Sequence, residues 1–363
     1  MTALADRSGP GLDEVLAQVA EGAAARDEQP SPSFPQDAIA ALEQAGVLAF
    51  NAQGTTARPS AAAELELVRQ VARADGSVGR IVDGHLNAVE RLTVQAPDAV
   101  REPDLAAVRA RRLRAGVWGG DPSGGEGPPA QVIAAGDGEV LRGVKTFCSG
   151  AGGLHRALVL ARTGSGGPPV SVWVDLTDAR RVEIDEGWYR SHGLRASVSH
   201  RVVFHDTPVL ARLGEPGSIA AQPWFSRDAL RTAATWAGMA DAALHSALSE
   251  LAGRPARGPL EALAAGRMIT AHATIELWIA HAARAMDGGG AELPQIAITA
   301  RAAISDACRS LLDEAARAVG SRPFARGGGL DRARRDLEVL LLQQRLDPML
   351  ARAGEYAMED HDR

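Results

Sequence analysis

Three histidines lie close together in the sequence. His192, His200 and His205 could ligate a metal ion, because neutral imidazole nitrogens are common metal ligands. His200 and His205, however, are an odd number of residues apart on a stretch that has the pattern of a β-strand. Successive side chains of a strand point to opposite faces, so these two imidazoles must diverge. We therefore expect surface or core histidines and no metal site.

Familiar catalytic motifs do not explain the chain either. The sequence contains no GxGxxG, no GxxxxGK[ST], no GxSxG and no HExxH, which excludes the usual signatures of dinucleotide sites, phosphate loops, serine hydrolases and zinc proteases. His85, within DGHLNAVERL, lies on an expected helix among apolar neighbours, which favours a packed side chain over a catalytic one. These generic patterns identify no reaction.

The elements that must position any site fall into three segments. Residues 1–115 have the period of amphipathic helices and predict an N-terminal helical domain. In the helix expected at 61–75, Leu65, Val68 and Ala72 share one stripe, and Gly76 follows its end.

Residues 116–212 change to short β-prone runs separated by turn residues. Strands are expected at 156–162, 170–176 and 201–209, and Gly136-Asp137-Gly138 marks a hairpin. No segment long enough for a helical crossover lies between the strands, as a parallel βαβ sheet would require. This middle domain is therefore predicted to be an antiparallel β barrel or sandwich.

Residues 213–363 return to a helical pattern. Four helices joined by glycine-rich turns predict a C-terminal four-helix bundle domain. The expected helices span 226–252, 259–286, 294–319 and 331–346. The fold class is thus an α+β multidomain protein with a helical domain, a β domain and a bundle in that order.

Composition narrows the possible partners and surroundings of the protein. The 363 residues include 39 basic and 45 acidic side chains, for a net charge of −6, and no basic run stands out. A nucleic-acid or anionic-membrane partner is therefore not expected. No segment has the length and apolarity of a membrane helix, and the N-terminus lacks a secretory pattern, so we expect a cytoplasmic protein.

Four stretches in this order resemble the acyl-CoA dehydrogenase superfamily of flavoproteins. Residues 143–161 contain G-x-K-x-F-x-S before a small-residue turn and an apolar strand, and residues 193–209 contain G-x-R-x-S-x-S before V-x-F-x-D-x-x-V. The helix at 226–252 carries Arg231 ahead of a run of small residues. Near the end, VGSRPF and RRDLEVLL resemble the family's glycine turn and its Arg-Asp helix.

The resemblance implies a bound FAD and names residues that would contact it. A flavin ring needs an aromatic or apolar wall and a hydrogen-bond donor near its reactive edge. Phe147 would replace the family's usual tryptophan and Ser149 its threonine or serine, and both are expected on one face of a single strand. Asp121, followed by Pro122, resembles the acid of the family's flavin loop, but the threonine before that acid is missing here, which predicts weaker flavin binding.

Further roles come from the same resemblance. Arg254 would reach the flavin pyrophosphate of a neighbouring subunit, and Gly320 would lie in the turn that contacts the same cofactor. Arg231 would lie at the acyl-CoA pocket and bind a phosphate or carbonyl oxygen. Because family members share the flavin site between subunits, a homodimer or homotetramer is expected.

The position of the catalytic base departs from the family. Dehydrogenation needs a carboxylate that removes a proton while hydride passes to the flavin. The matching position after Arg335-Asp336 holds Gln344, and the alternative position before Arg231 holds Leu230. Neither side chain can accept the proton, and loss of a positioned base costs about 10²–10⁴ in rate. Asp228 and Glu338 are the remaining candidates for a base.

Three hypotheses follow. The first is an FAD-dependent acyl-CoA dehydrogenase that uses an unidentified base. The second is a flavin-dependent monooxygenase or oxidase of the same fold, which needs no glutamate and which the stretch from Lys145 to Ala151 resembles at least as closely. The third is a non-catalytic relative that binds flavin or CoA. The sequence leaves the substrate's acyl chain and the electron acceptor open.

Overall fold

The structure, a computed structural model, describes residues 11–54, 58–136, 138–164, 166–256, 258–343 and 346–361. The first group of elements consists of helices, as the sequence predicted. Ser60 caps α3 by accepting a hydrogen bond from the backbone N–H of Ala63, and Asp75 caps α4 through the N–H of Val78. The helices are α1 (Leu12–Asp27), α2 (Gln36–Gln44), α3 (Ala61–Ala74), α4 (Gly76–Gln95) and α5 (Asp98–Arg109).

The middle of the chain forms a seven-stranded sheet whose pairings close into a circuit, β4–β2–β3–β7–β5–β4, with β1 on β4 and β6 on β7. This arrangement confirms the predicted barrel. Most pairs are antiparallel, but β1 and β2 pair with β4 in parallel, which the alternating pattern did not show. The strands are β1 (Ala115–Trp118), β2 (Gln131–Ala135), β3 (Gly138–Cys148), β4 (Arg156–Thr163), β5 (Val170–Asp175), β6 (Val182–Asp185) and β7 (His200–Arg212).

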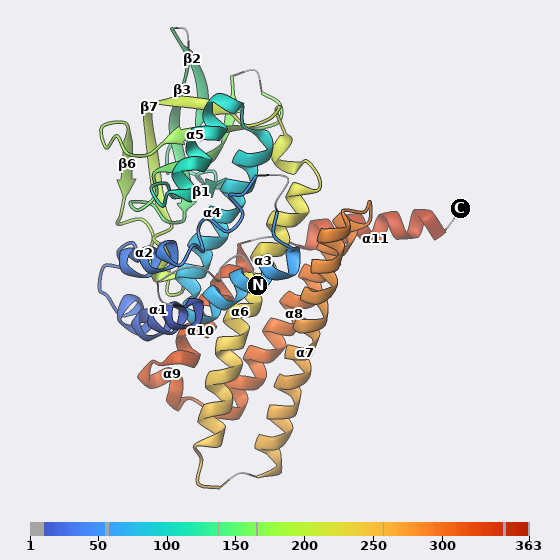
Figure 1. Cartoon of the computed structure of the whole chain (residues 1–363). Coiled ribbons are helices and arrows are strands. Elements are labelled where there is room, and N and C mark those ends of the chain that lie inside the picture. Colours follow the sequence, from blue (N-terminus) through green and yellow to red (C-terminus); the bar gives the residue numbers. More distant parts are fainter. Residues whose placement is uncertain are drawn as a thin grey trace.

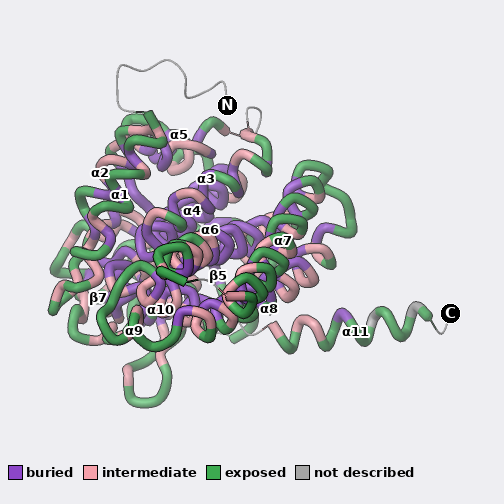
Figure 2. Tube along the Cα trace, turned by 90° about the horizontal axis from the view of Figure 1, so that it is seen from below, coloured by how far each residue is buried: buried purple, intermediate pink, exposed green. Residues whose placement is uncertain are grey.

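The C-terminal part is again helical, and its long helices run side by side below the sheet (Figure 1). The last bundle helix, α10, ends at Leu342, before the predicted limit of 346. The final helix extends away from the body (Figure 2). These helices are α6 (Trp224–Ala252), α7 (Pro259–Gly288), α8 (Leu293–Val319), α9 (Arg322–Arg326), α10 (Gly329–Leu342) and α11 (Asp347–His361).

Helices α4 and α6 form the centre of the molecule. Every residue of α4 from Gly76 to Thr93 is buried, including several charged ones. Helix α6 packs on α3, α4, α8 and α10 through a face rich in alanine, which allows the helices to approach closely. Gly238 is required there, since a Cβ atom would come within 2.1 Å of the carbonyl oxygen of Arg69. Among the described residues, no helix is long and apolar enough to cross a membrane.

Candidate functional site

Phe147 ends the regular part of β3 in an unusual conformation. Its φ angle is +54°, in the left-handed region that non-glycine residues rarely adopt. The ring is 56% exposed, and it meets Trp188 edge to face with 5.0 Å between ring centroids. An exposed aromatic side chain on a strained backbone is a feature that packing of the core does not require. Phe147 and Trp188 therefore form an open aromatic wall.

Ser149 lies just after β3, so the expectation that it shares a strand face with Phe147 is wrong. The strand ends at Cys148, and the left-handed residue at 147 changes the direction of the chain. The Ser149 hydroxyl nevertheless lies beside a polar row, 2.9 Å from the Ser199 hydroxyl, which is 2.8 Å from that of Ser197. The structure thus links three hydroxyl groups next to the aromatic wall.

A tight turn holds this row of hydroxyls. Leu194 and Val198, which flank the short 3-10 helix η1 (Arg195–Ser197), both have positive φ angles. Val198 is β-branched, and a left-handed β-branched residue persists only where its surroundings fix it. Burial raises the pKa of the neighbouring Tyr189, while hydrogen bonding with Ser191 and Ser197 opposes that rise. The turn therefore presents a fixed set of polar groups.

His200 extends the polar set toward β7. Its ring meets Tyr189 edge to face with 6.5 Å between centroids, and its buried Nδ1 has no hydrogen-bond partner among the described residues. Burial lowers the pKa of His200, which favours the neutral ring. His205 on the same strand points outward and bonds Glu183, which confirms that the two imidazoles diverge.

Asp121 is held by two cations. Its carboxylate accepts from Lys145 at 2.8 Å and from Arg162 at 2.9 Å. Partial burial opposes ionisation of Asp121, but these two hydrogen bonds keep its pKa below the ordinary value. Lys145 is almost completely buried, and burial lowers its pKa. Lys145 had no role predicted from sequence, although it is the chain's single lysine and joins the 119–121 loop to β3.

Arg231 lies inside the protein, and this placement contradicts its expected role in substrate binding. The side chain is fully buried and donates to Glu64 at 2.9 Å, Glu90 at 2.6 Å and Asn87 at 3.0 Å. These acids raise the pKa of Arg231 against the effect of burial. The guanidinium is committed to helices α3 and α4, so it cannot turn toward a ligand without breaking these bonds.

Asp228, a candidate base, belongs to the same buried network. It accepts from Arg91 at 2.5 Å and from Arg231 at 3.3 Å, and its side chain is 19% exposed. Burial raises its pKa to about 7 although both arginines favour the charged form. A carboxylate held by two guanidinium groups is poorly placed to collect a proton from a substrate.

The other base candidates receive no support. Glu338 is on the outer side of α10, where it pairs with Arg334 at 2.8 Å and is 42% exposed. Gln344, the residue at the family's usual glutamate position, lies outside the described residues. None of these candidates is therefore a free base beside Phe147, and Glu126, which lies at the aromatic wall, accepts from Trp188 at 2.8 Å and from the N–H of Ser123.

Arg254 and Gly320 are brought together, far along the bundle from the β domain. Arg254 donates to the carbonyl oxygens of Ala318 and Val319 at 2.7 and 3.0 Å, just before Gly320, and to Glu261 at 3.1 Å. The arginine thereby caps the end of α8. Its expected role at a cofactor of a neighbouring subunit stays a prediction, but its donors are engaged within this chain.

Two further clusters have structural explanations. His85 is buried, with one ring nitrogen on the carbonyl of Leu48 and the other accepting from the N–H of Ala115, so it packs as predicted. Asp241, His272 and Glu276 place ligand atoms within 4.8 Å of one another. The Arg69 guanidinium bonds Asp241 at 2.6 Å and also bonds Glu276, so an arginine already provides the positive charge in this cluster.

The described residues fit a flavin at the end of β3. Phe147 and Trp188 supply an aromatic wall, and Ser149 supplies a hydroxyl donor. The unpartnered nitrogen of His200 lies in the same region. A flavin bound here would contact these side chains and the 119–121 loop.

Comparison with known proteins agrees with this geometry. Residues 217–342 match the family model of the acyl-CoA dehydrogenase C-terminal domain. No curated protein matches the chain. Among solved structures, FMN-bound TdsC from Paenibacillus sp. A11-2 is similar at a TM-score of 0.82 and 20% identity, covering 95% of this chain and 96% of TdsC.

Two other solved structures share the architecture. Methanesulfinate monooxygenase MsuC from Pseudomonas fluorescens has a TM-score of 0.81 at 20% identity and covers 95% of each chain. KijD3, in complex with FMN and a dTDP-linked amino sugar, has a TM-score of 0.78 at 21% identity, with 92% of this chain and 88% of KijD3 covered. The chain therefore has the acyl-CoA dehydrogenase fold, and its residues 217–342 match the C-terminal domain of that family.

Proposed function

We propose that the protein is a flavin-dependent monooxygenase with the acyl-CoA dehydrogenase fold. The observation that carries this proposal is the row of hydroxyls at Ser149, Ser199 and Ser197 beside the Phe147 wall. Such a site offers hydrogen-bond donors, and the carboxylate at its wall, Glu126, is already engaged by Trp188 and Ser123. The similarity to a methanesulfinate monooxygenase and to TdsC, a dibenzothiophene monooxygenase, supports the same chemistry.

Acyl-CoA dehydrogenation has less support than oxygen chemistry. It requires a base, and Asp228 and Glu338 are both engaged with arginines. Position 344 carries an amide. The contact between α4 and α6 is also filled by charged groups, including Glu90, Asp83 and Arg231, and such surroundings are unfavourable for an aliphatic acyl chain.

We propose FMN as the cofactor in place of the FAD expected from sequence. Arg254 was expected to reach the FAD pyrophosphate of a neighbouring subunit, and its guanidinium instead caps α8 within this chain. TdsC and KijD3 are both described with FMN. FMN lacks the second phosphate and the adenosine, so it needs no residue at the far end of the bundle.

The chain's own residues have defined roles in this reaction. A flavin held here and reduced by an external reductase would supply the two electrons that activate molecular oxygen, so that one oxygen atom passes to the substrate and the other leaves as water. Phe147 and Trp188 form the wall against the ring and exclude water from it. Ser149 donates to the flavin's polar edge, and Ser199 and Ser197 provide hydroxyls through which a proton can be exchanged with Ser149.

The proposal is tested by giving the protein FMN, an external NADH-dependent flavin reductase and isotopically labelled oxygen, with indole and methanesulfinate as first probes. We expect labelled oxygen in the product, or a change in the rate at which the bound flavin is reoxidised when a probe is present. Bleaching of the flavin by an acyl-CoA under anaerobic conditions would instead establish dehydrogenation. Failure to bind either flavin would indicate a non-catalytic relative.

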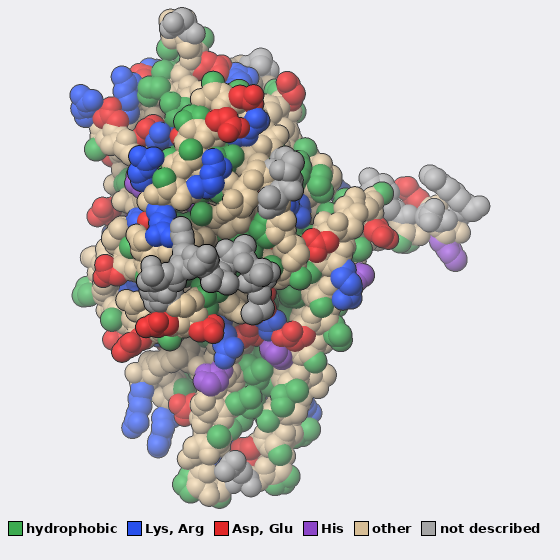
Figure 3. Space-filling model, viewed as in Figure 1, with side chains coloured by type: hydrophobic (Ala, Val, Ile, Leu, Met, Phe, Trp, Pro, Cys, Tyr) green, Lys and Arg blue, Asp and Glu red, His purple; other side chains and the backbone are tan. Residues whose placement is uncertain are grey.

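We also propose that the protein forms a homo-oligomer through α7. Leu260, Leu263, Ile269 and Leu277 of this helix are exposed by 76, 50, 54 and 71%. Hydrophobic side chains are visible over the lower bundle in Figure 3. Exposed apolar faces of this kind mark association surfaces. Light scattering of the protein and of the variant Leu277→Glu measures the oligomeric state, and the variant is expected to dissociate.

A further inference from the structure

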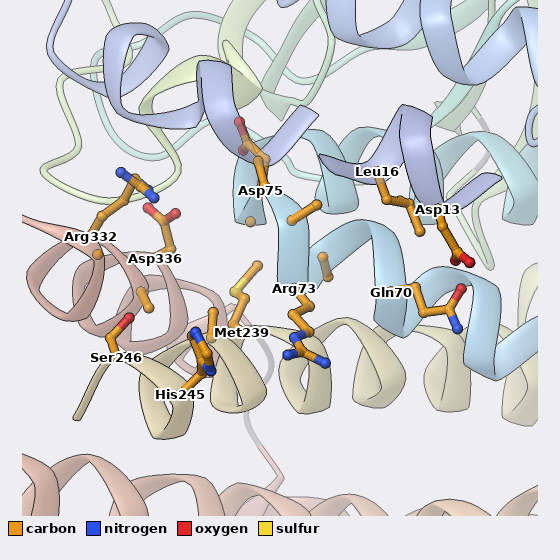
Figure 4. A pocket seen from close by; sticks show the side chains of 17 residues that line it. Asp13, Leu16, Gln70, Arg73, Asp75, Met239, His245, Ser246, Arg332 and Asp336 are labelled. Atoms are coloured by element: carbon orange, nitrogen blue, oxygen red, sulfur yellow. The ribbon is translucent and has the colours of Figure 1, made fainter. Parts of the chain in front are cut away.

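A pocket of about 420 Å³ lies among α1, α3, α6 and α10, away from the Phe147 wall (Figure 4). Its walls combine small apolar residues with charged side chains of both signs. Asp336 and Arg332 lie at one end, and Asp13 and Gln70 lie at the other. The charged side chains that face it are Asp13, Arg73, Asp75, Arg332 and Asp336, together with the titratable His245.

Asp336 is the deepest acid of the pocket and is only 3% exposed. Its Oδ1 accepts from the backbone N–H of Leu194 at 2.5 Å. Within the described chain, its Oδ2 has no hydrogen bond, and no arginine, lysine or histidine nitrogen lies within ion-pair distance of the carboxyl group. Gly76 leaves the space beside it open, since a Cβ there would come within 2.8 Å of Oδ2.

The neighbouring acid already has hydrogen-bond and ion-pair partners. Asp75 pairs with Arg26 at 2.8 Å and caps α4. Burial raises the pKa of Asp336 to about 7, and the charge of Asp75 adds to this shift. Burying a carboxyl group that has an unbonded oxygen and no counter-ion destabilises the fold, unless a hydrogen-bond donor or a cation binds that oxygen. Asp336 is therefore a buried acid of this pocket that lacks a positive partner.

Two arginines that line the same pocket lack a negatively charged partner. Arg73 and Arg332 have no side-chain hydrogen bond or ion pair in the described ranges of the chain. Arg332 and Asp336 are four residues apart on α10, a spacing at which ion pairs form. No such pair forms between them, so both charges remain available to a ligand.

We propose that this pocket binds a small zwitterion, a molecule with an ammonium group for Asp336 and a carboxylate for Arg332. The aliphatic part between these two groups would pack against Met239, Ala242 and Ala333, which line the same cavity. A monovalent anion would be repelled by the unpaired carboxylate of Asp336. A simple amine would pair with Asp336 but would leave Arg73 and Arg332 unpaired. Only a ligand with both charges pairs with Asp336 and Arg332 together, which lie at the same end of the pocket.

The site is separate from the flavin chemistry proposed above but is connected to it through the backbone. Leu194 donates to Asp336, and the same turn continues to Ser197 and Ser199 of the hydroxyl row. A ligand that binds Asp336 would therefore be linked, through the Leu194 N–H, to the turn that positions Ser199, the partner of Ser149. Binding itself does not depend on the flavin and can be measured without any catalytic activity.

Isothermal titration of the full-length protein with ω-amino acids from glycine to 8-aminooctanoate tests the proposal. Each member is compared with the amine and the carboxylic acid of the same chain length. We expect at least one ω-amino acid to bind at least about tenfold more tightly than both of its singly charged analogues, the effect of one charge-assisted hydrogen bond. Equal affinity for the amine and the amino acid, or no binding by any member, would overturn the proposal.

Variants assign the binding to this pocket. Asp336→Asn keeps an oxygen for the Leu194 N–H but removes the charge, and Arg332→Gln removes the cation at the rim; each is expected to weaken binding by about tenfold. Arg334→Gln, on the same helix but paired with Glu338, is the matched control and should bind normally. If Asp336→Asn fails to fold, Arg332→Gln still decides the result, because unchanged affinity in that variant contradicts the proposed site.

Discussion

Replacing Arg231 with methionine distinguishes a structural arginine from a substrate-binding one. The guanidinium is fully buried and donates to Glu64 at 2.9 Å and to Glu90 at 2.6 Å. Methionine keeps much of the stem but removes the charge from beside both acids. Breaking a buried ion pair by removing one partner costs about 3–5 kcal/mol. Arg227 still bonds both acids, so we expect the lower limit, about 3 kcal/mol.

Urea denaturation of the wild type and Arg231→Met measures this loss directly. The double variant Arg231→Met, Glu90→Gln removes one of the acids left without its partner, so it should recover about 1 kcal/mol or more of the loss. A matched titration with a CoA thioester monitors ligand binding. The reasoning is refuted if Arg231→Met loses less than about 1 kcal/mol of stability while CoA thioester binding disappears.

Three other variants test separate parts of the structure. Asp336→Asn removes a carboxyl whose pKa is raised to about 7; a raised pKa stabilises the fold at acidic pH and this benefit is lost as the pH rises. The stability advantage of the wild type over this variant should therefore shrink between about pH 4 and pH 7, as urea titrations at each pH would show. Ser149→Ala should reduce product formation roughly tenfold with a smaller change in FMN affinity, and Ser149→Thr should restore it, as measured by labelled product and flavin fluorescence. Arg254→Ala should leave FMN affinity unchanged and lower stability by about 0.5–1 kcal/mol in the same urea assay, whereas a large loss of flavin binding would support the intersubunit role.

Local sequence patterns predicted the elements because each depends on nearby residues. The stripe of Leu65, Val68 and Ala72 is buried in α3 as the helical period required. The strand parity of His200 and His205 likewise placed one inside and one outside. The ends of elements were less predictable: α10 stops at Leu342, and β3 ends at Cys148, before Ser149.

The partners of charged residues could not be predicted, because they come from distant segments. Arg231 was assigned to a ligand because its place ahead of a run of small residues resembles the family's first bundle helix. Its main partners, Glu64 and Glu90, lie on α3 and α4, more than a hundred residues earlier in the chain. The pocket around Asp336 has the same origin, since α1, α3, α6 and α10 each supply part of its wall.

The segment from Gly193 to Ser199 connects helix α10 and Asp336 to the row of hydroxyl groups at the end of β3. Gly193 packs so closely on α10 that a Cβ would come within 2.1 Å of the carbonyl oxygen of Arg335, and the next N–H, of Leu194, is bonded to Asp336. The two left-handed residues, Leu194 and Val198, cost energy that these contacts must offset. The strain is retained because it places the Ser199 hydroxyl against Ser149, at the end of β3. A sequence pattern that joins a glycine and two serines therefore specifies how a bundle helix and a β barrel are held together at one polar edge.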